Sequence, residues 1–174
     1  MKLHYLIVQN LLIILFGVIV LYLDYIEFQG IDSRILLVCF SLIKSGYFLV
    51  TGFRKILIFS KSDLQYHHFL LFIGLSIMLV VFSYVADYLC LYMIEPSNFT
   101  GINAGLPWYE LLFKFLFFSV MIFGNLGVVT VAPASSVAEF LMMTEAILSF
   151  ITIIIVLSDF ISLKESLMGK RTKS

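Results

Sequence analysis

Long apolar stretches separated by short polar connections dominate this chain. Four of them reach the length of about 20 residues that an α-helix needs to cross the hydrocarbon core of a bilayer: residues 5–27, 34–58, 68–93 and 136–161. The alternating pattern typical of a membrane barrel is absent, and a lone strand in lipid would leave backbone groups unpaired. The pattern therefore predicts an all-α membrane protein with four transmembrane helices.

A fifth apolar stretch lies between the third and fourth predicted spans and is too short to cross. Pro107 suits the first turn of a helix, and Gly124 with Gly127 breaks the apolar run that follows. A helix over 107–122 would be only about 22–24 Å long. Irregular backbone at membrane depth survives only when it is buried in protein or lines a water-filled cavity. We therefore predict a re-entrant pore helix followed by a filter-like loop over 123–133.

Composition agrees with a membrane protein, because 61% of the residues are hydrophobic and only 13% are charged. Eleven basic and eleven acidic residues give a formal net charge of zero, so no basic surface indicates nucleic acid. The expected partners are membrane lipid and protein, with no nucleic acid. We expect an integral protein of the plasma (cell) membrane.

Basic residues indicate the orientation, since short cytoplasmic connections carry the excess of Lys and Arg. They gather at and beyond the end of the second predicted span, as Arg54, Lys55 and Lys61, and after the fourth, as Lys164, Lys170, Arg171 and Lys173. The connection over 94–107 has none. Both termini are therefore predicted to be cytoplasmic, with residues 94–135 on the outer side.

The short helix and its loop resemble a known family. The segment FFSVMIFGNLGVVTVAP, residues 117–133, is similar to the pore region of the tetrameric potassium channel superfamily. In that family a pore helix ending F-S-V-x-T-x-T-T leads into V-G-Y-G-D and then a proline. Without gaps, Asn125 falls on the last threonine, Gly127 on the first filter glycine and Pro133 on the proline. The end of the pore helix corresponds to Phe118, Ser119 and Val120.

The resemblance covers roughly residues 68–165 and implies a homotetramer in which four subunits surround one cation pathway. In the family, backbone carbonyls of V-G-Y-G point inward and replace the hydration shell of potassium. The span over 136–161 is similar to the inner, pore-lining helix and places Glu145 at its acidic or amide position. The implied permeant or bound ions are monovalent cations, K⁺ or Na⁺, and no other cofactor or metal site is expected.

Three positions depart from the family pattern. Val129 stands at the second filter glycine, and a β-branched residue in a left-handed conformation costs about 1–2 kcal/mol, which would strain a standard filter. Asn125 replaces a threonine and Thr130 an acidic residue, so rings of amides and hydroxyls could bind partly hydrated cations. We predict a weakly selective or non-selective cation channel. Its pathway is assigned to Gly124, Asn125, Leu126, Gly127, Val128, Val129 and Thr130.

Charged residues within apolar stretches need partners or water. Lys44 lies near the middle of the second span, and Asp87 and Lys114 lie at compatible depths. We expect Asp87 and Lys114 to form a structural ion pair behind the filter. For Glu145 two alternatives remain open. It either faces the pore cavity and attracts cations, or it hydrogen-bonds the pore helix.

The predicted organisation has peripheral transmembrane helices over 1–60, a pore module over 61–165 and a short cytoplasmic tail over 166–174. The pore module comprises an outer helix (68–93), the pore helix (107–122), the filter loop (123–133) and the inner helix (136–161). Nothing joins a nucleophile to a base, so we expect no catalytic residue and no enzyme. The alternatives are a non-conducting membrane scaffold or accessory subunit and, less favoured, a transporter, whose fold normally shows two related halves.

Overall fold

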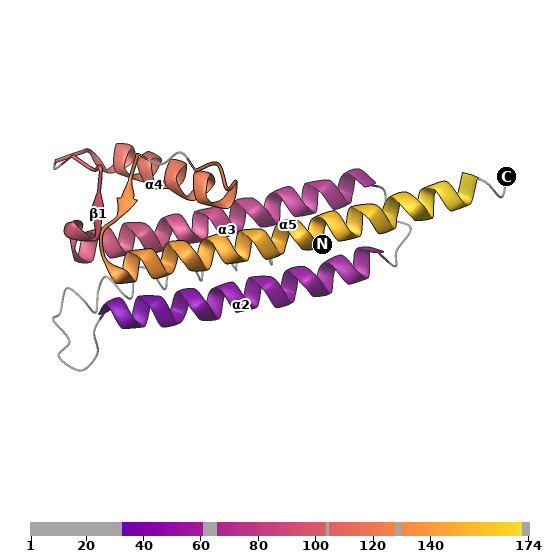
Figure 1. The fold of residues 1–174 in the computed structure, drawn as a ribbon, viewed down its shortest axis with the longest axis horizontal. Helices are drawn as coiled ribbons and strands as arrows, with labels where there is room; N and C mark the ends of the chain where they lie inside the picture. Colours follow the sequence, from indigo (N-terminus) through magenta and orange to yellow (C-terminus); the bar gives the residue numbers. More distant parts are fainter. Residues whose placement is uncertain (1–32, 61–65, 104, 128–129, 172–174) are drawn as a thin grey trace.

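The computed structural model describes residues 33–60, 66–103, 105–127 and 130–171. These residues fold into a helical bundle (Figure 1). The helices are α2 (Ser33–Ser60), α3 (Tyr66–Ile94), α4 (Trp108–Phe123) and α5 (Ser136–Arg171). A 3₁₀ turn, η1 (Pro96–Asn98), precedes strand β1 (Phe99–Thr100), and strand β2 (Ala132–Pro133) precedes α5. The predicted span over 5–27 lies outside the described residues.

Three of these helices are long and apolar enough to cross a membrane. Their candidate spans are Arg34–Thr51 in α2, Ile73–Ile94 in α3 and Ser136–Ser158 in α5. The predictions of helices over 34–58, 68–93 and 136–161 are confirmed, with α5 continuing further than expected. The described residues are mostly helical, with two short strands, and the three apolar helices are compatible with an integral membrane protein.

The three long helices lie side by side, and α4 lies along the end of the bundle where α3 ends and α5 begins (Figure 1). α4 packs against α3 and α5. α2 packs against the same two helices, on the side away from α4 in this view. The space beside α3 and α5 is thus occupied by a full-length helix on one side and a half-length helix on the other.

The beginning of α4 agrees with the sequence prediction. Pro107 precedes the helix in an extended conformation, with φ −63° and ψ 150°, and the helix starts at Trp108. Glu110 lies in the first turn, where a negative charge interacts favourably with the helix dipole. The predicted helix over 107–122 is observed as the 16 residues of α4.

Two short segments pair at the end of the bundle near the start of α4. β1 and β2 form an antiparallel pair in which Phe99 faces Pro133 and Thr100 faces Ala132. The pairing joins the chain that leaves α3 to the chain that enters α5. We call the segments 98–101 and 130–134 together the neck, because they close the base of the region that contains α4.

An aromatic cluster fills the core between α3, α4 and the neck. Tyr88, Phe99, Phe115 and Phe118 are all buried. Ring centroids lie 5.0 Å apart for Tyr88 with Phe118 and for Phe99 with Phe115, both with edge-to-face geometry. Such pairs contribute about 0.5–1.5 kcal/mol each beyond burial. Lipid is as apolar as these side chains, so close packing rather than escape from water holds α4 here.

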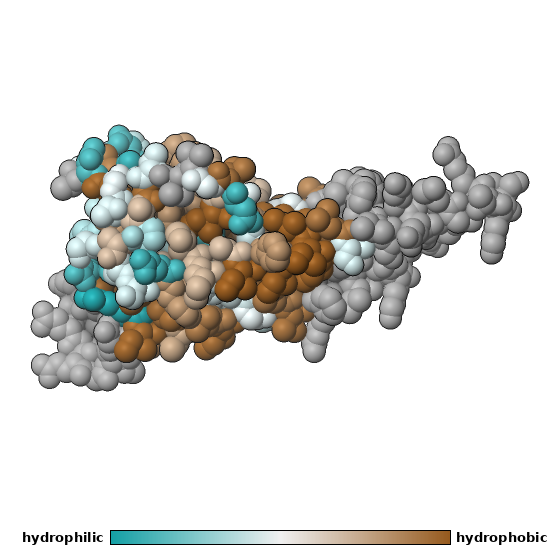
Figure 2. Space-filling view, viewed as in Figure 1, coloured by the Kyte–Doolittle hydropathy of each residue, from teal (hydrophilic) through white to brown (hydrophobic). Residues whose placement is uncertain are grey.

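The surface has the polarity expected for a bundle that crosses a bilayer. Figure 2 shows hydrophilic residues at the end that carries the neck and a continuous hydrophobic band further along the helices. Exposed large apolar side chains occur on all three long helices, for example Ile43 on α2, Leu71 on α3 and Phe150 on α5. A band of this kind would be covered by lipid or by another protein chain.

Candidate functional site

The helix α4 ends about half-way along the two helices against which it packs. The Ser119 hydroxyl lies 3.3 Å from the backbone carbonyl of Val81 on α3, and the Ser149 hydroxyl on α5 donates to the carbonyl of Phe123. Val81 is the ninth of 22 residues in its span, and Ser149 is the fourteenth of 23. At 1.5 Å per residue, both lie about 20 Å from the neck end of the spans.

The last turn of α4 is closed by its own chain. Amide groups of Gly124, Asn125 and Leu126 donate to the carbonyls of Val120, Ile122 and Met121 at 2.8, 3.0 and 3.0 Å. Asn125 has φ 52°, so these bonds form a Schellman motif with Asn125 in its left-handed position. With Ser149 bound to the Phe123 carbonyl, all four terminal carbonyls of α4 have donors. The helix therefore stops here for local reasons.

The residues that follow α4 differ, because no backbone donor to their carbonyls occurs among the described residues. Residues 124–127 are exposed, with the Leu126 side chain 59% accessible. Within the described part of the chain, the backbone hydrogen bonds include none to the carbonyls of 124–127. Four of the seven predicted pathway residues, Gly124 to Gly127, thus lie together at the C-terminal end of α4. We call this the inward end of α4, because it lies toward the middle of the long helices. Val128 and Val129 lie outside the described residues.

Thr130 belongs to the neck and is separated from the inward end of α4. The chain at Thr130 passes so close to Gly101 that a Cβ atom added to Gly101 would lie 2.0 Å from the Thr130 carbonyl oxygen. The amide of Ala134 donates to the carbonyl of Asn98 at 2.8 Å and continues the contact. Asn98 is buried, and its side-chain amide donates to the carbonyl of Leu91 at 3.1 Å. The neck therefore fixes both ends of the α4 region to the end of α3.

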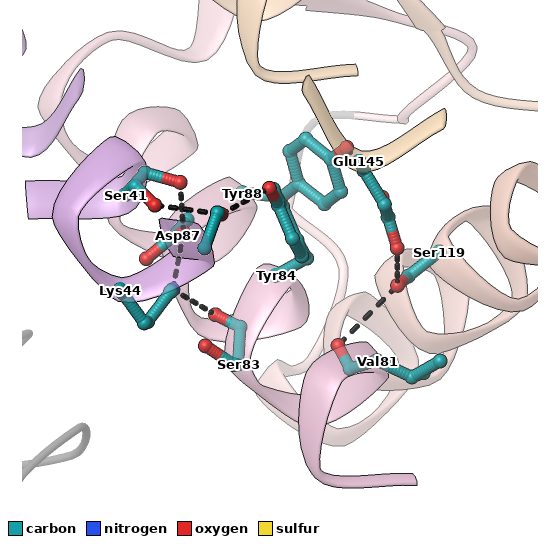
Figure 3. Close-up of polar contacts among 10 residues, drawn as sticks. Ser41, Lys44, Val81, Ser83, Tyr84, Asp87, Tyr88, Ser119 and Glu145 are labelled. Carbon is teal, nitrogen blue, oxygen red and sulfur yellow. Dashed lines mark hydrogen bonds and ion pairs between the residues drawn. The ribbon is translucent and has the colours of Figure 1, made fainter. Parts of the chain in front are cut away.

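Glu145 lies at the place where three helices meet. It is fully buried, and its carboxyl oxygens accept hydrogen bonds from the Tyr88 hydroxyl of α3 at 2.6 Å and from the Ser119 hydroxyl of α4 (Figure 3). Of the two alternatives for Glu145, the structure has the hydrogen bond to the short helix. We call Ser119, Phe123, Glu145 and Ser149, with Tyr88, the α4–α5 junction.

The expected ion pair between Asp87 and Lys114 is wrong. Asp87 instead accepts from the Lys44 ammonium at 2.5 Å and from the Ser41 hydroxyl at 2.8 Å, and both charged side chains are buried. Lys114 donates to the backbone carbonyl of Gly101 at 3.4 Å, near the neck. Asp87 faces α2 rather than α4. It therefore neutralises the charge of Lys44, for which the sequence indicated no partner.

Further hydroxyl groups complete the polar contact between α2 and α3. Ser45 donates to the carbonyl of Ser41 at 2.7 Å and shares a 2.6 Å hydrogen bond with the Tyr84 hydroxyl. Lys44 also donates to the carbonyl of Ser83 at 3.1 Å (Figure 3). We call these side chains, with Asp87, the α2–α3 network. All residues of the α2–α3 network belong to α2 or α3.

Sequence reasoning missed most of these hydroxyl partners, although a signal was present. Ser41, Lys44 and Ser45 have the spacing i, i+3, i+4, and Tyr84, Asp87 and Tyr88 repeat it on α3. Side chains with this spacing share one face of a helix. Two polar faces of equal length within apolar spans indicate a helix–helix contact.

Among protein families, curated proteins and solved structures, none matches this chain. Its function must therefore be inferred from the contacts of its own residues. Two features are the most unusual. One is the half-length helix α4, whose terminal carbonyls all accept hydrogen bonds. The other is the segment that follows it, whose carbonyls accept no backbone hydrogen bond from the described residues.

Proposed function

We propose that this chain is one subunit of a homotetrameric, potassium-channel-like cation channel with weak or no selectivity, in the plasma membrane. The observation that carries the proposal is the position of residues 124–127. They follow a helix that ends half-way along the transmembrane spans, and they are exposed in the single chain.

The reason is the energetics of backbone groups in lipid. Each unsatisfied carbonyl in the hydrocarbon region costs several kcal/mol, so irregular backbone at that depth must meet protein or water. Among the described residues, no backbone amide outside the regular helices and strands donates to the carbonyls of 124–127. Four copies around an axis would enclose water there, and the carbonyls would then serve as cation ligands.

The exposed side of α5 supports the same arrangement. Its large apolar side chains point away from the rest of the chain at helical spacing, and Phe150 is 62% exposed. This stripe consists of Phe140, Met143, Ile147, Phe150, Ile154 and Leu157. α2 and α4 already pack against other sides of α5. In the proposed tetramer the stripe borders the pathway below residues 124–127 and neighbouring subunits, and it can form an apolar constriction.

Weak selectivity follows from the small number of well-placed ligands. The terminal carbonyls of α4 each accept a hydrogen bond already, so they are less suited as ion ligands than the carbonyls that follow them. What remains are the carbonyls of 124–127, the Asn125 side chain and, nearer the neck, Thr130. The resemblance to the potassium channel superfamily supports this assignment, and the departure at Val129 supports reduced discrimination between cations.

The proposed orientation places the neck outside the cell and both termini in the cytoplasm. It rests on the basic residues after the second and fourth predicted spans. Cations would then enter from the neck side, pass residues 124–127 and leave along the exposed stripe of α5.

Flux measurements on purified protein in liposomes test the proposal. We expect a tetrameric particle and flux of K⁺ and Na⁺ with a permeability ratio within about tenfold of one, since one tenfold step in selectivity corresponds to only about 1.4 kcal/mol. Ca²⁺ flux, measured alongside, shows whether divalent ions pass. Asn125→Gly retains the left-handed backbone but removes the amide, so we expect a changed ratio.

Thr144→Ala is the matched control, because the Thr144 hydroxyl is bonded to the carbonyl of Phe140 within α5. Its permeability ratio should equal that of the wild type. A monomeric particle, or flux that is the same with and without the Asn125 amide, would overturn the assignment of the pathway. A tetramer with no flux at all would favour the non-conducting scaffold.

A further inference from the structure

Two hydrogen bonds join α4 to α5 with matching spacing. Ser119 donates to Glu145, and Ser149 donates to the carbonyl of Phe123. The two residues on α4 are four apart, and so are the two on α5. Residues four apart lie on one face of a helix, one turn from each other. Since both numbers increase together, α4 and α5 run in the same direction where they touch.

This spacing means that the two bonds determine the depth of α4 along α5. Apolar packing alone does not determine the depth, because one apolar turn resembles the next. A shift by one turn would separate both pairs and leave the Ser119 hydroxyl and the Glu145 carboxyl group without each other in an apolar interior. Buried polar pairs are known to set the register of helices in this way.

A third helix fixes the same point. Tyr88 of α3 donates to the second carboxyl oxygen of Glu145 at 2.6 Å, and the Ser119 hydroxyl lies 3.3 Å from the carbonyl of Val81 on α3. The aromatic cluster and the neck hold the other end of α4. The inward half of α4 therefore depends on the junction for its position.

We propose that Glu145 and Ser149 are positioning residues that hold the inward end of α4, and with it residues 124–127, at one depth along α5. The link to ion permeation rests on the proposed channel function. The link to the position of α4 does not, because it concerns contacts within one chain.

Hydrogen exchange of backbone amides tests the positioning directly. The amides of Gly124, Asn125 and Leu126 are hydrogen-bonded at the end of α4, so their exchange reports its opening. Glu145→Ala should speed their exchange about tenfold or more, because it leaves the buried Tyr88 hydroxyl without its acceptor and removes the hydrogen bond between Ser119 and α5. Ser149→Ala removes only the second bond, and we expect a smaller acceleration of about threefold to tenfold.

Two further variants separate positioning from a general loss of packing. Glu145→Gln retains side-chain groups that can hydrogen-bond both hydroxyls, so exchange should remain within about threefold of wild type. Ser45→Ala makes the same change as Ser149→Ala at a buried hydroxyl of the α2–α3 network. Its exchange at residues 124–126 should equal that of the wild type.

Unchanged exchange at 124–126 in both Glu145→Ala and Ser149→Ala would overturn the proposal. So would an acceleration spread equally over α2, α3 and α4. If Glu145→Ala does not fold, Ser149→Ala alone decides between these outcomes. In the liposome assay, Glu145→Ala should also change the K⁺ to Na⁺ permeability ratio, whereas Glu145→Gln should not. Absence of flux in the wild-type protein would contradict the channel proposal. The proposal that Glu145 and Ser149 position α4 would then be tested by hydrogen exchange alone.

Discussion

The α2–α3 network and the α4–α5 junction use similar residues for different purposes. The network contains a cation and an anion in direct contact, Lys44 and Asp87, so its formal charges cancel. The junction contains the carboxyl group of Glu145, which is met by two hydroxyls rather than by a base. One contact joins two full-length helices, and the other joins a half-length helix to a long one.

The difference shows how each region responds to the loss of one partner. Removing one member of a buried ion pair leaves a charge without compensation, whereas removing the Ser149 hydroxyl leaves only the neutral backbone carbonyl of Phe123 without its donor. The network should therefore dominate the global stability of the bundle. The junction and the neck should dominate the local position of α4, because the long helices do not need them to remain packed.

The largest expected effect comes from Asp87→Ala, which would leave the buried Lys44 ammonium without its partner. We expect a loss of about 3–5 kcal/mol in the free energy of unfolding. Unfolding in mixed micelles, followed by circular dichroism, measures it. Replacing both members, Lys44→Met with Asp87→Leu, should recover most of the loss, because no buried charge remains. A double variant as unstable as Asp87→Ala would show that the charges do not dominate this contact.

A smaller loss is expected at the neck from Gly101→Ala. Gly101 has φ 82°, and an added Cβ would meet the Thr130 carbonyl, so the two segments would have to separate. We expect a loss of about 2–3 kcal/mol, measured by the same unfolding experiment. Gly105→Ala is the matched control, since Gly105 also has φ 82° but, apart from its chain neighbours, no atom of the described residues lies within 4 Å of an added Cβ. Equal losses for the two variants would assign the whole effect to backbone strain and none to the close contact.

At the inward end of α4, Asn125→Val should have a modest effect. A β-branched residue in the left-handed position of the Schellman motif costs about 1–2 kcal/mol. Asn125→Gly should be neutral or slightly stabilising, because glycine is the preferred residue there. Hydrogen exchange of the Leu126 amide, which donates to the Met121 carbonyl, reports the change locally. Faster exchange in the glycine variant than in the valine variant would contradict the assigned conformation.

The smallest effect is expected from Glu95→Gln, which weakens a second link between α2 and α3. Glu95 lies 2.5 Å from Arg34, but the two side chains are 39% and 42% exposed. Exposed ion pairs contribute about 0–1 kcal/mol and weaken as salt increases. We expect the free energy of unfolding, measured by thermal unfolding, to fall by an amount within that range at low salt. At high salt we expect no change. A loss of stability as large as that of Asp87→Ala would mean that the difference in burial between the two ion pairs does not determine their contributions.

Much of the fold could be predicted because helix length and helix ends are local properties. Apolar stretches of sufficient length predicted α2, α3 and α5, and Pro107 with Gly124 delimited α4 within a residue or two. Residues that end a helix, and the length of an apolar stretch, can be recognised without knowing which helices pack together. The resemblance to a pore region, the tetramer and the permeant ion stay predictions, since nothing in the fold of one chain tests them.

The partners of buried charges could not be predicted, because they depend on the rotation of each helix about its own axis. Apart from the polar spacing that Lys44 and Asp87 share with neighbouring hydroxyl residues, these spans are apolar on most sides, so the apolar pattern gives little indication of which side faces which helix. Depth alone made Lys114 a suitable partner for Asp87, and the structure pairs Asp87 with Lys44 instead. For Glu145, depth allowed both a cavity and a hydrogen bond to α4, and rotation of α5 decides between them.

The neck has a consequence for how this protein can vary. It brings residues 101 and 130 together, so the connection before α4 begins at a fixed point and lies outside the contacts among the long helices. Doubling the length of a flexible loop adds only about 0.6 kcal/mol to its closure. Extra residues beside Asn103, which is exposed, would leave the packing of α4 intact. An epitope tag inserted there would report which side of the membrane this connection faces, and the proposed orientation predicts that it is the extracellular side.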